Sequence, residues 1–124
     1  METIEQFTQR FASDVHAVCG HCYPKANRSG SYTLCKFNQN RPRGFVAYVH
    51  AQEDRFRICS KKDWASKAGV LSKADDESPG LIFCEDGIWF NIPFNDQRAY
   101  DKAVQAIGAI CSIRPKLNES KRNK

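Results

Sequence analysis

A short segment near the N-terminus, residues 19–22 (CGHC), combines two thiols and an imidazole in the spacing of disulfide-exchange motifs. In those motifs the first cysteine lies at the start of a helix, whose dipole lowers the thiol pKa. Here a helical pattern comes before the motif, and Tyr23 and Pro24 follow it. The helix dipole would therefore oppose thiolate formation, and we do not expect redox chemistry.

The same thiols have the spacing of one half of a zinc site. Cys19 and Cys22 form a CxxC pair, and twelve residues separate Cys22 from Cys35. Side chains that could complete a tetrahedral set are His16, His21, His50 and Cys59. Structural zinc sites usually combine two closely spaced pairs, and the sequence has no second CxxC or CxxH pair. We therefore expect no metal or other cofactor, and keep zinc at Cys19, Cys22 and Cys35 as the alternative.

Motifs that would identify an enzyme are not found. The sequence contains no GxSxG, P-loop, HExxH or GxGxxG pattern. His50 is followed by two acidic residues, Glu53 and Asp54, but a single histidine at the end of a strand is more often a surface residue. No catalytic residue is assigned, and a small enzyme whose site leaves no motif is kept only as a third possibility.

Basic residues are concentrated in one part of the chain. The 124 residues carry 19 Lys and Arg against 14 Asp and Glu, a net charge of +5. Residues 25–62 alone hold nine basic and two acidic side chains. Such a concentration favours an acidic partner, most often nucleic acid. The alternative is a surface that is merely kept soluble by its charge.

Length and composition indicate one globular domain with its own core. A transmembrane helix would need about 18 consecutive apolar residues, and no such run exists. The N-terminal residues METIEQFTQRF lack the basic start and apolar run of a signal peptide. We expect a cytoplasmic protein with reduced thiols and no membrane partner.

Two helices are predicted from apolar residues that recur every three or four positions. The first covers residues 3–18, with Thr3 as its cap and Gly20 after its end. The second follows Pro93, is capped by Asn95 or Asp96, and continues to about residue 111. A short helix is predicted between residues 61 and 69, with Asp63 as its cap. Residues 114–124, which follow the helix and include Pro115, are predicted to be a flexible basic tail.

Alternating strand-like runs are predicted at 31–37, 44–50, 55–60, 81–84 and 88–92. Short polar turns between neighbouring runs favour antiparallel pairing. The expected fold class is α+β: a single domain over 1–113, in which an antiparallel sheet of about five strands has both helices packed on one face. The residues expected to share the core are Phe7, Phe11, Phe45, Phe56, Ile58, Val104 and Ile107.

The third run predicts an exposed basic face, because Arg55 and Arg57 alternate with apolar residues. Tyr48 is expected on the same face, together with Val46 and His50, whereas Trp89 is expected in the core. The residues predicted to bind nucleic acid are Arg41, Arg43, Tyr48, Arg55, Arg57, Lys61 and Lys62. We predict a non-catalytic module that binds nucleic acid or another polyanion. The alternative is a protein-interaction or accessory domain, monomeric or dimeric, that recognises an acidic partner.

Several of these runs form a recognisable series between residues 31 and 111. An aromatic strand (SYTLCKF) is followed by a second and a basic third strand (GFVAYVH, DRFRICS), an aromatic strand (GIWFNIPF) and a closing helix (NDQRAYDKAVQAIGAI). This series resembles a small bacterial domain of unknown function that is found attached to restriction-type nucleases and predicted transport proteins. The resemblance implies a DNA-related or defence context, and it assigns no catalytic residue.

Overall fold

The computed structural model describes residues 2–37, 43–69, 81–83 and 87–122; of these, only the backbone is described at residues 36, 37, 43, 81–83 and 114–122. The chain forms three helices and six strands within these ranges. In chain order the elements are α1 (Ile4–Cys19), β1 (Tyr23–Ala26), β2 (Tyr32–Phe37), β3 (Arg43–Ala51), β4 (Arg55–Lys61), α2 (Lys62–Lys67), β5 (Leu81–Phe83), β6 (Gly87–Pro93) and α4 (Gln97–Arg122).

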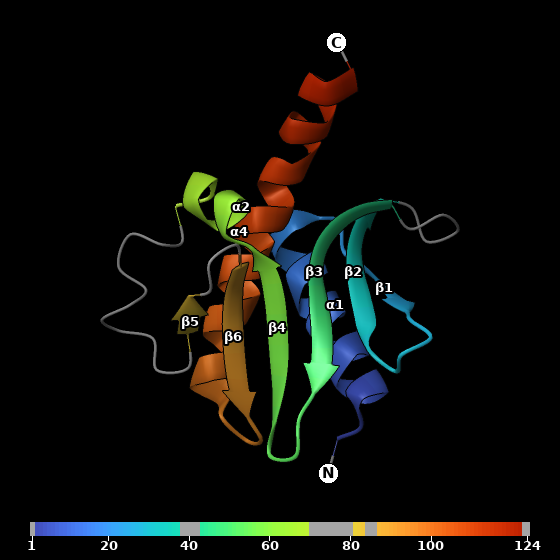
Figure 1. Cartoon of the computed structure of the whole chain (residues 1–124), viewed down its shortest axis with the longest axis vertical. Helices are drawn as coiled ribbons and strands as arrows, with labels where there is room; N and C mark the ends of the chain where they lie inside the picture. Colours follow the sequence, from blue (N-terminus) through green and yellow to red (C-terminus); the bar gives the residue numbers. More distant parts are fainter. Residues whose placement is uncertain (1, 38–42, 70–80, 84–86, 123–124) are drawn as a thin grey trace.

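The strands form one antiparallel sheet in the order β1-β2-β3-β4-β6-β5, which confirms the predicted α+β class (Figure 1). The sheet has one strand more than predicted, because β1 pairs with β2 where a turn-rich link was expected. Pro24 lies in β1 opposite Leu34. Proline has no backbone N–H to donate to a ladder, and it is tolerated there because β1 is an edge strand.

Helices α1 and α4 lie behind the sheet in Figure 1, on the same face. Helix α1 begins as predicted: the Thr3 hydroxyl accepts a hydrogen bond from the Gln6 backbone N–H, and the Gln6 side chain accepts one from the Thr3 N–H. It ends at Gly20, whose φ of 81° is readily adopted only by glycine. Helix α4 is capped by Asp96, whose side chain accepts from the Ala99 N–H.

A single hydrophobic core fills the space between the helices and the sheet. Six of the seven predicted core residues are buried in it: Phe7, Phe11, Phe56, Ile58, Val104 and Ile107. The rings of Phe7 and Phe56 stack at 4.1 Å and connect α1 to the centre of the sheet. Phe45 is the exception, because it is only partly buried and packs against the margin of this core.

The position of Phe45 results from a bulge in β3. Leu34 pairs with Ala47 and Cys35 with Phe45, so Val46 is an extra residue without a partner in β2. The prediction that Val46 shares a face with Tyr48 was therefore wrong, since Val46 is fully buried. The Ser60 hydroxyl donates to the Val46 carbonyl at 2.7 Å, which satisfies an acceptor at the irregularity.

Two predictions about helix ends were also wrong. Asp63 lies in the first turn of α2 and not at its cap, which is Lys61 and makes no side-chain capping hydrogen bond. Helix α4 continues to Arg122, whereas its end was predicted near residue 111. A proline removes one backbone hydrogen bond, but the good helix formers around Pro115, such as Lys116 and Leu117, favour continuation. The last turns of α4 project beyond the sheet in Figure 1.

None of the helices in the described ranges is both long enough and apolar enough to span a bilayer.

Candidate nucleic-acid interface on the open face of the sheet

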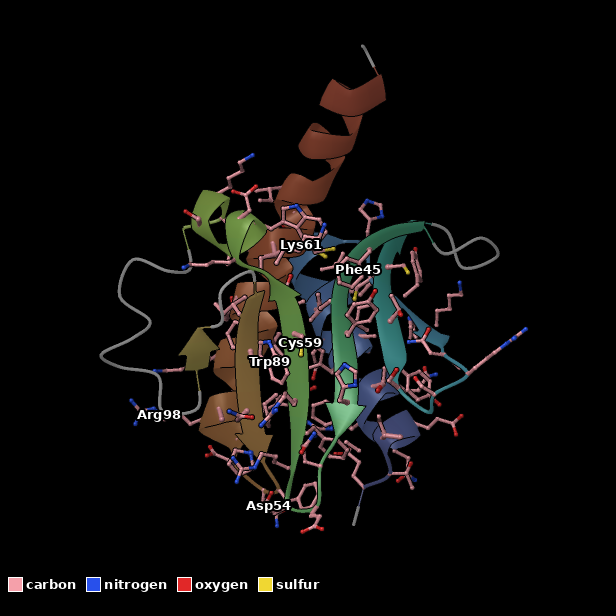
Figure 2. The ribbon with its side chains drawn as sticks, in the orientation of Figure 1. Phe45, Asp54, Cys59, Lys61, Trp89 and Arg98 are labelled. Carbon is pink, nitrogen blue, oxygen red and sulfur yellow. The ribbon has the colours of Figure 1, made fainter. Side chains whose placement is uncertain are left out.

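The sheet has a second face, opposite α1 and α4, which we call the open face. Along β4, Phe56, Ile58 and Ser60 are buried toward the helices, so the alternate residues Arg55, Arg57, Cys59 and Lys61 lie on the open face. Strand pairing extends this face in rows. One row runs Lys25, Thr33, Tyr48, Cys59, Trp89, and the next runs His50, Arg57, Asn91. Figure 2 shows Phe45, Cys59 and Trp89 in front of the strands, with the helices behind.

Arg57 is held at the centre of the open face by two neighbours on β6. Its Nε donates to the Asn91 Oδ1 at 2.9 Å, and its guanidinium carbon lies 4.6 Å from the centroid of the Trp89 ring. Among the described residues no carboxylate lies within salt-bridge distance of Arg57. The guanidinium is therefore fixed in position while its charge remains available to an external anion.

Lys61 repeats this arrangement at the end of β4, where its Nζ lies 5.0 Å from the centroid of the Trp64 ring. Trp64 belongs to α2 and is buried in the core, so the Lys61 ammonium group lies against a ring that the core holds in place. The next residue, Lys62, begins α2 and is exposed. Both ammonium groups lie at the same end of β4, and no ion pair joins either of them to an acid within the described part of the chain.

Among the described side chains, Tyr48 is the most exposed aromatic residue, with 43% of its surface accessible. The bulge in β3 places Phe45 on the same side as Tyr48, and the two ring centroids are 4.4 Å apart. His50 continues the series, with its ring 6.2 Å from that of Tyr48. The exposed phenol thus has other rings on both sides of it along β3, which favours a preformed stacking surface.

The remaining predicted residues are less well placed for binding. Arg55 donates from Nε and its terminal nitrogen to both carboxylate oxygens of Asp54, each at 2.9 Å. This hydrogen-bonded pair lowers the pKa of Asp54 and raises that of Arg55, so their charges compensate each other. Arg43 begins β3 opposite Phe37, but its side chain lies outside the described residues. Arg41 lies outside them altogether.

Sequence reasoning missed Trp89 and Asn91, the two residues that orient Arg57. Trp89 was expected in the core, whereas Phe90 takes that place and Trp89 is half-buried on the open face. The alternation of Ile88, Phe90 and Ile92 in the sequence was the available signal, because residues between them must point the other way. Their position beside Arg57 depends on the β4–β6 register, which the sequence does not specify.

The cysteines at the end of α1 form a mostly buried group. The thiols of Cys19 and Cys111 both donate to the His21 carbonyl, at 2.9 and 2.7 Å. The pKa of Cys22 is raised well above its usual value, first by burial and then by the nearby thiols of Cys19 and Cys35. A raised pKa opposes thiolate chemistry. Across the residues that the structure describes, no three His, Cys, Asp or Glu side chains are arranged to hold a metal ion.

A cleft of about 550 Å³ lies elsewhere, between α1 and the turn that joins β6 to α4. Its cation, Arg10, donates to both oxygens of Glu2 at 2.8 and 2.9 Å and lies 4.0 Å from the centroid of Tyr100. The Tyr100 hydroxyl donates to Asp14. The cation of the cleft is therefore already paired with a carboxylate, in contrast to Arg57 and Lys61 within the described residues.

No protein-family model, curated protein or solved structure matches this chain. The resemblance of residues 31–111 to a small bacterial domain stays a prediction, and the assignment of the open face depends on its own geometry and charge.

Proposed function

We propose that this protein is a non-catalytic nucleic-acid-binding module that uses the open face of its sheet. The proposal depends mainly on the contacts of the Arg57 guanidinium. Asn91 and Trp89 hold this cation in place, and no carboxylate in the described part of the chain forms an ion pair with it. A guanidinium held in this way can donate to a phosphate oxygen without first breaking an ion pair.

The charge around Arg57 supports the same proposal. Lys25 lies at one end of the Tyr48 row, and Lys61 and Lys62 lie at the end of β4. The described residues that face outward from β2, β3, β4 and β6 include no acidic side chain between these cations, and Asp54 lies at the β3–β4 turn. A basic surface with exposed aromatic rings is the usual composition of a face that binds nucleic acid.

The proposal is tested by the salt dependence of binding to a mixed-sequence oligonucleotide. Fluorescence anisotropy would be measured from about 50 to 200 mM salt, over which phosphate contacts weaken steeply. Arg57→Ala should weaken binding and lower the slope of log Kd against log salt by roughly one. Arg98→Ala is the matched control, since Arg98 is exposed on α4, away from the open face, and its loss removes the same charge (Figure 2).

Two results would contradict the proposal. One is the absence of binding to any nucleic acid at about 50 mM salt, where such contacts are strongest. The other is an equal effect of Arg57→Ala and Arg98→Ala, which would mean that only the net charge matters. Binding to an acidic protein with little salt dependence, without binding to nucleic acid, would instead support the alternative of a protein-interaction domain.

A further inference from the structure

The open face carries aromatic rings as well as cations, and the rings lie in a different cross-strand row from Arg57. Tyr48 and Trp89 belong to the same cross-strand row, with Cys59 between them. Since neighbouring strands lie about 4.8 Å apart, the two residues are separated by roughly 10 Å. Arg57 lies one row away and is diagonal to both rings.

The two rings also differ in what covers them. The Trp89 ring already lies under the Arg57 guanidinium, and its Nε1 is 3.4 Å from the point where a Cβ on Gly87 would lie. A Cβ at Gly87 would thus be in ordinary van der Waals contact with the edge of the indole. Tyr48 is supported by Phe45 but remains 43% exposed. Trp89 is thus placed to orient Arg57, and Tyr48 is placed to meet a ligand.

We infer that the open face binds single-stranded nucleic acid, with a base stacked on Tyr48 and the adjoining phosphates at Arg57 and Lys61. This inference rests on the proposed function and names its substrate class. A duplex turns its phosphates outward and keeps its bases stacked on each other, so an exposed ring on a sheet has no base to contact. A single strand can offer the faces of its bases and its backbone to the same surface.

The stacking role of Tyr48 is distinguished from a structural one by two substitutions. Tyr48→Phe keeps a ring and should retain affinity within about twofold, because stacking needs only the aromatic face. Tyr48→Leu keeps an apolar side chain without a ring and should weaken single-strand binding by about five- to 100-fold. Val18→Ala is a matched control, because Val18 is 44% exposed but belongs to α1, on the other side of the sheet. Circular dichroism would verify that each variant is folded.

The experiment measures Kd for fluorescein-labelled oligothymidylate and oligouridylate of about 12 nucleotides, a length within the usual site size. A mixed-sequence DNA duplex of equal length is measured beside them at one salt concentration. We expect tighter binding to both single strands than to the duplex, and we expect Tyr48→Leu to weaken binding of the single strands alone.

Equal or tighter binding of the duplex would overturn the inference, as would unchanged single-strand binding by the Tyr48→Leu protein. If Arg57→Ala still weakened binding in that case, the proposed function would stand without the single-strand preference. If none of the three probes bound, both would fail.

Discussion

The Arg57 guanidinium lies 4.6 Å from the centroid of the Trp89 ring, although the two residues are not direct partners in the sheet. Arg57 pairs with Asn91, and Trp89 pairs with Cys59, so the contact is diagonal across β4 and β6. The hydrogen bond from Arg57 to Asn91 fixes the guanidinium over the ring. Because no described carboxylate neutralises it, the contact orients a charge that a ligand can use.

The first prediction concerns the energy of this contact. In a double-mutant cycle, Arg57→Ala and Trp89→Leu should show a coupling of about 0.5–1 kcal/mol in the free energy of unfolding, the range for partly exposed cation–π pairs. Urea denaturation of the four proteins supplies the measurement. Additive effects of the two changes would mean that the contact does not hold Arg57 in place.

A second prediction concerns the pair formed by Asp54 and Arg55. Removing the carboxylate by Asp54→Ala frees the Arg55 guanidinium, so nucleic-acid binding should tighten and its salt slope should rise by up to about one. Asp101→Ala, on the exposed surface of α4, removes an equal charge and is the control. The gain should disappear when Arg55→Ala is added to Asp54→Ala. If Asp101→Ala tightened binding as much, the position of the charge would be irrelevant.

Much of this arrangement follows from local sequence patterns. The helical spacing of Phe7 and Phe11 and the alternation of Phe56 and Ile58 predicted which faces are buried, because burial in one common core imposes those periods. The open-face position of Arg55 and Arg57 follows from the same alternation. These features depend on neighbouring residues alone, which explains why one sequence suffices to predict them.

Other features depend on contacts between distant segments. The bulge at Val46 reverses the alternation of β3, and nothing in the sequence GFVAYVH indicates it. The edge strand β1 contains a proline and follows a turn-rich segment, so it resembles a loop until its pairing with β2 is known. The approach of Trp89 to Arg57 depends on the β4–β6 register, which is determined by the whole sheet.

A third prediction tests how closely α1 and α4 approach each other. A Cβ added to Gly108 would lie 2.6 Å from Cγ1 and 3.1 Å from Cβ of Val18. Gly108→Ala should therefore destabilise the protein by about 1–3 kcal/mol despite the better helix propensity of alanine. Adding Val18→Ala removes the nearest methyl groups and should recover part of the loss. A Gly108→Ala protein as stable as wild type in thermal unfolding would mean that the helices can separate at little cost.

A fourth prediction concerns alkaline pH. Burial, followed by the hydrogen bond to Asp14, raises the pKa of Tyr100 above its usual value near 10. The folded protein then keeps a proton that the unfolded chain loses, so the contribution of Tyr100 to stability is complete below about pH 10 and falls as the pH rises further. Tyr100→Phe should be less stable at neutral pH by about 1 kcal/mol, and its stability should fall less steeply above pH 10. Parallel curves for the two proteins would contradict this assignment.

The most direct test of the central claim is to locate the bound nucleic acid on the protein by NMR. Labelled protein would be titrated with oligothymidylate of about 12 nucleotides at about 50 mM salt, following backbone amides and the two tryptophan indole N–H groups. We predict that the largest shifts occur at Tyr48, Arg57 and Trp89, with smaller shifts near Lys61. Shifts confined to α1 and α4, or to the cleft beside Arg10 and Tyr100, would contradict binding through the open face, as would a spectrum that does not change.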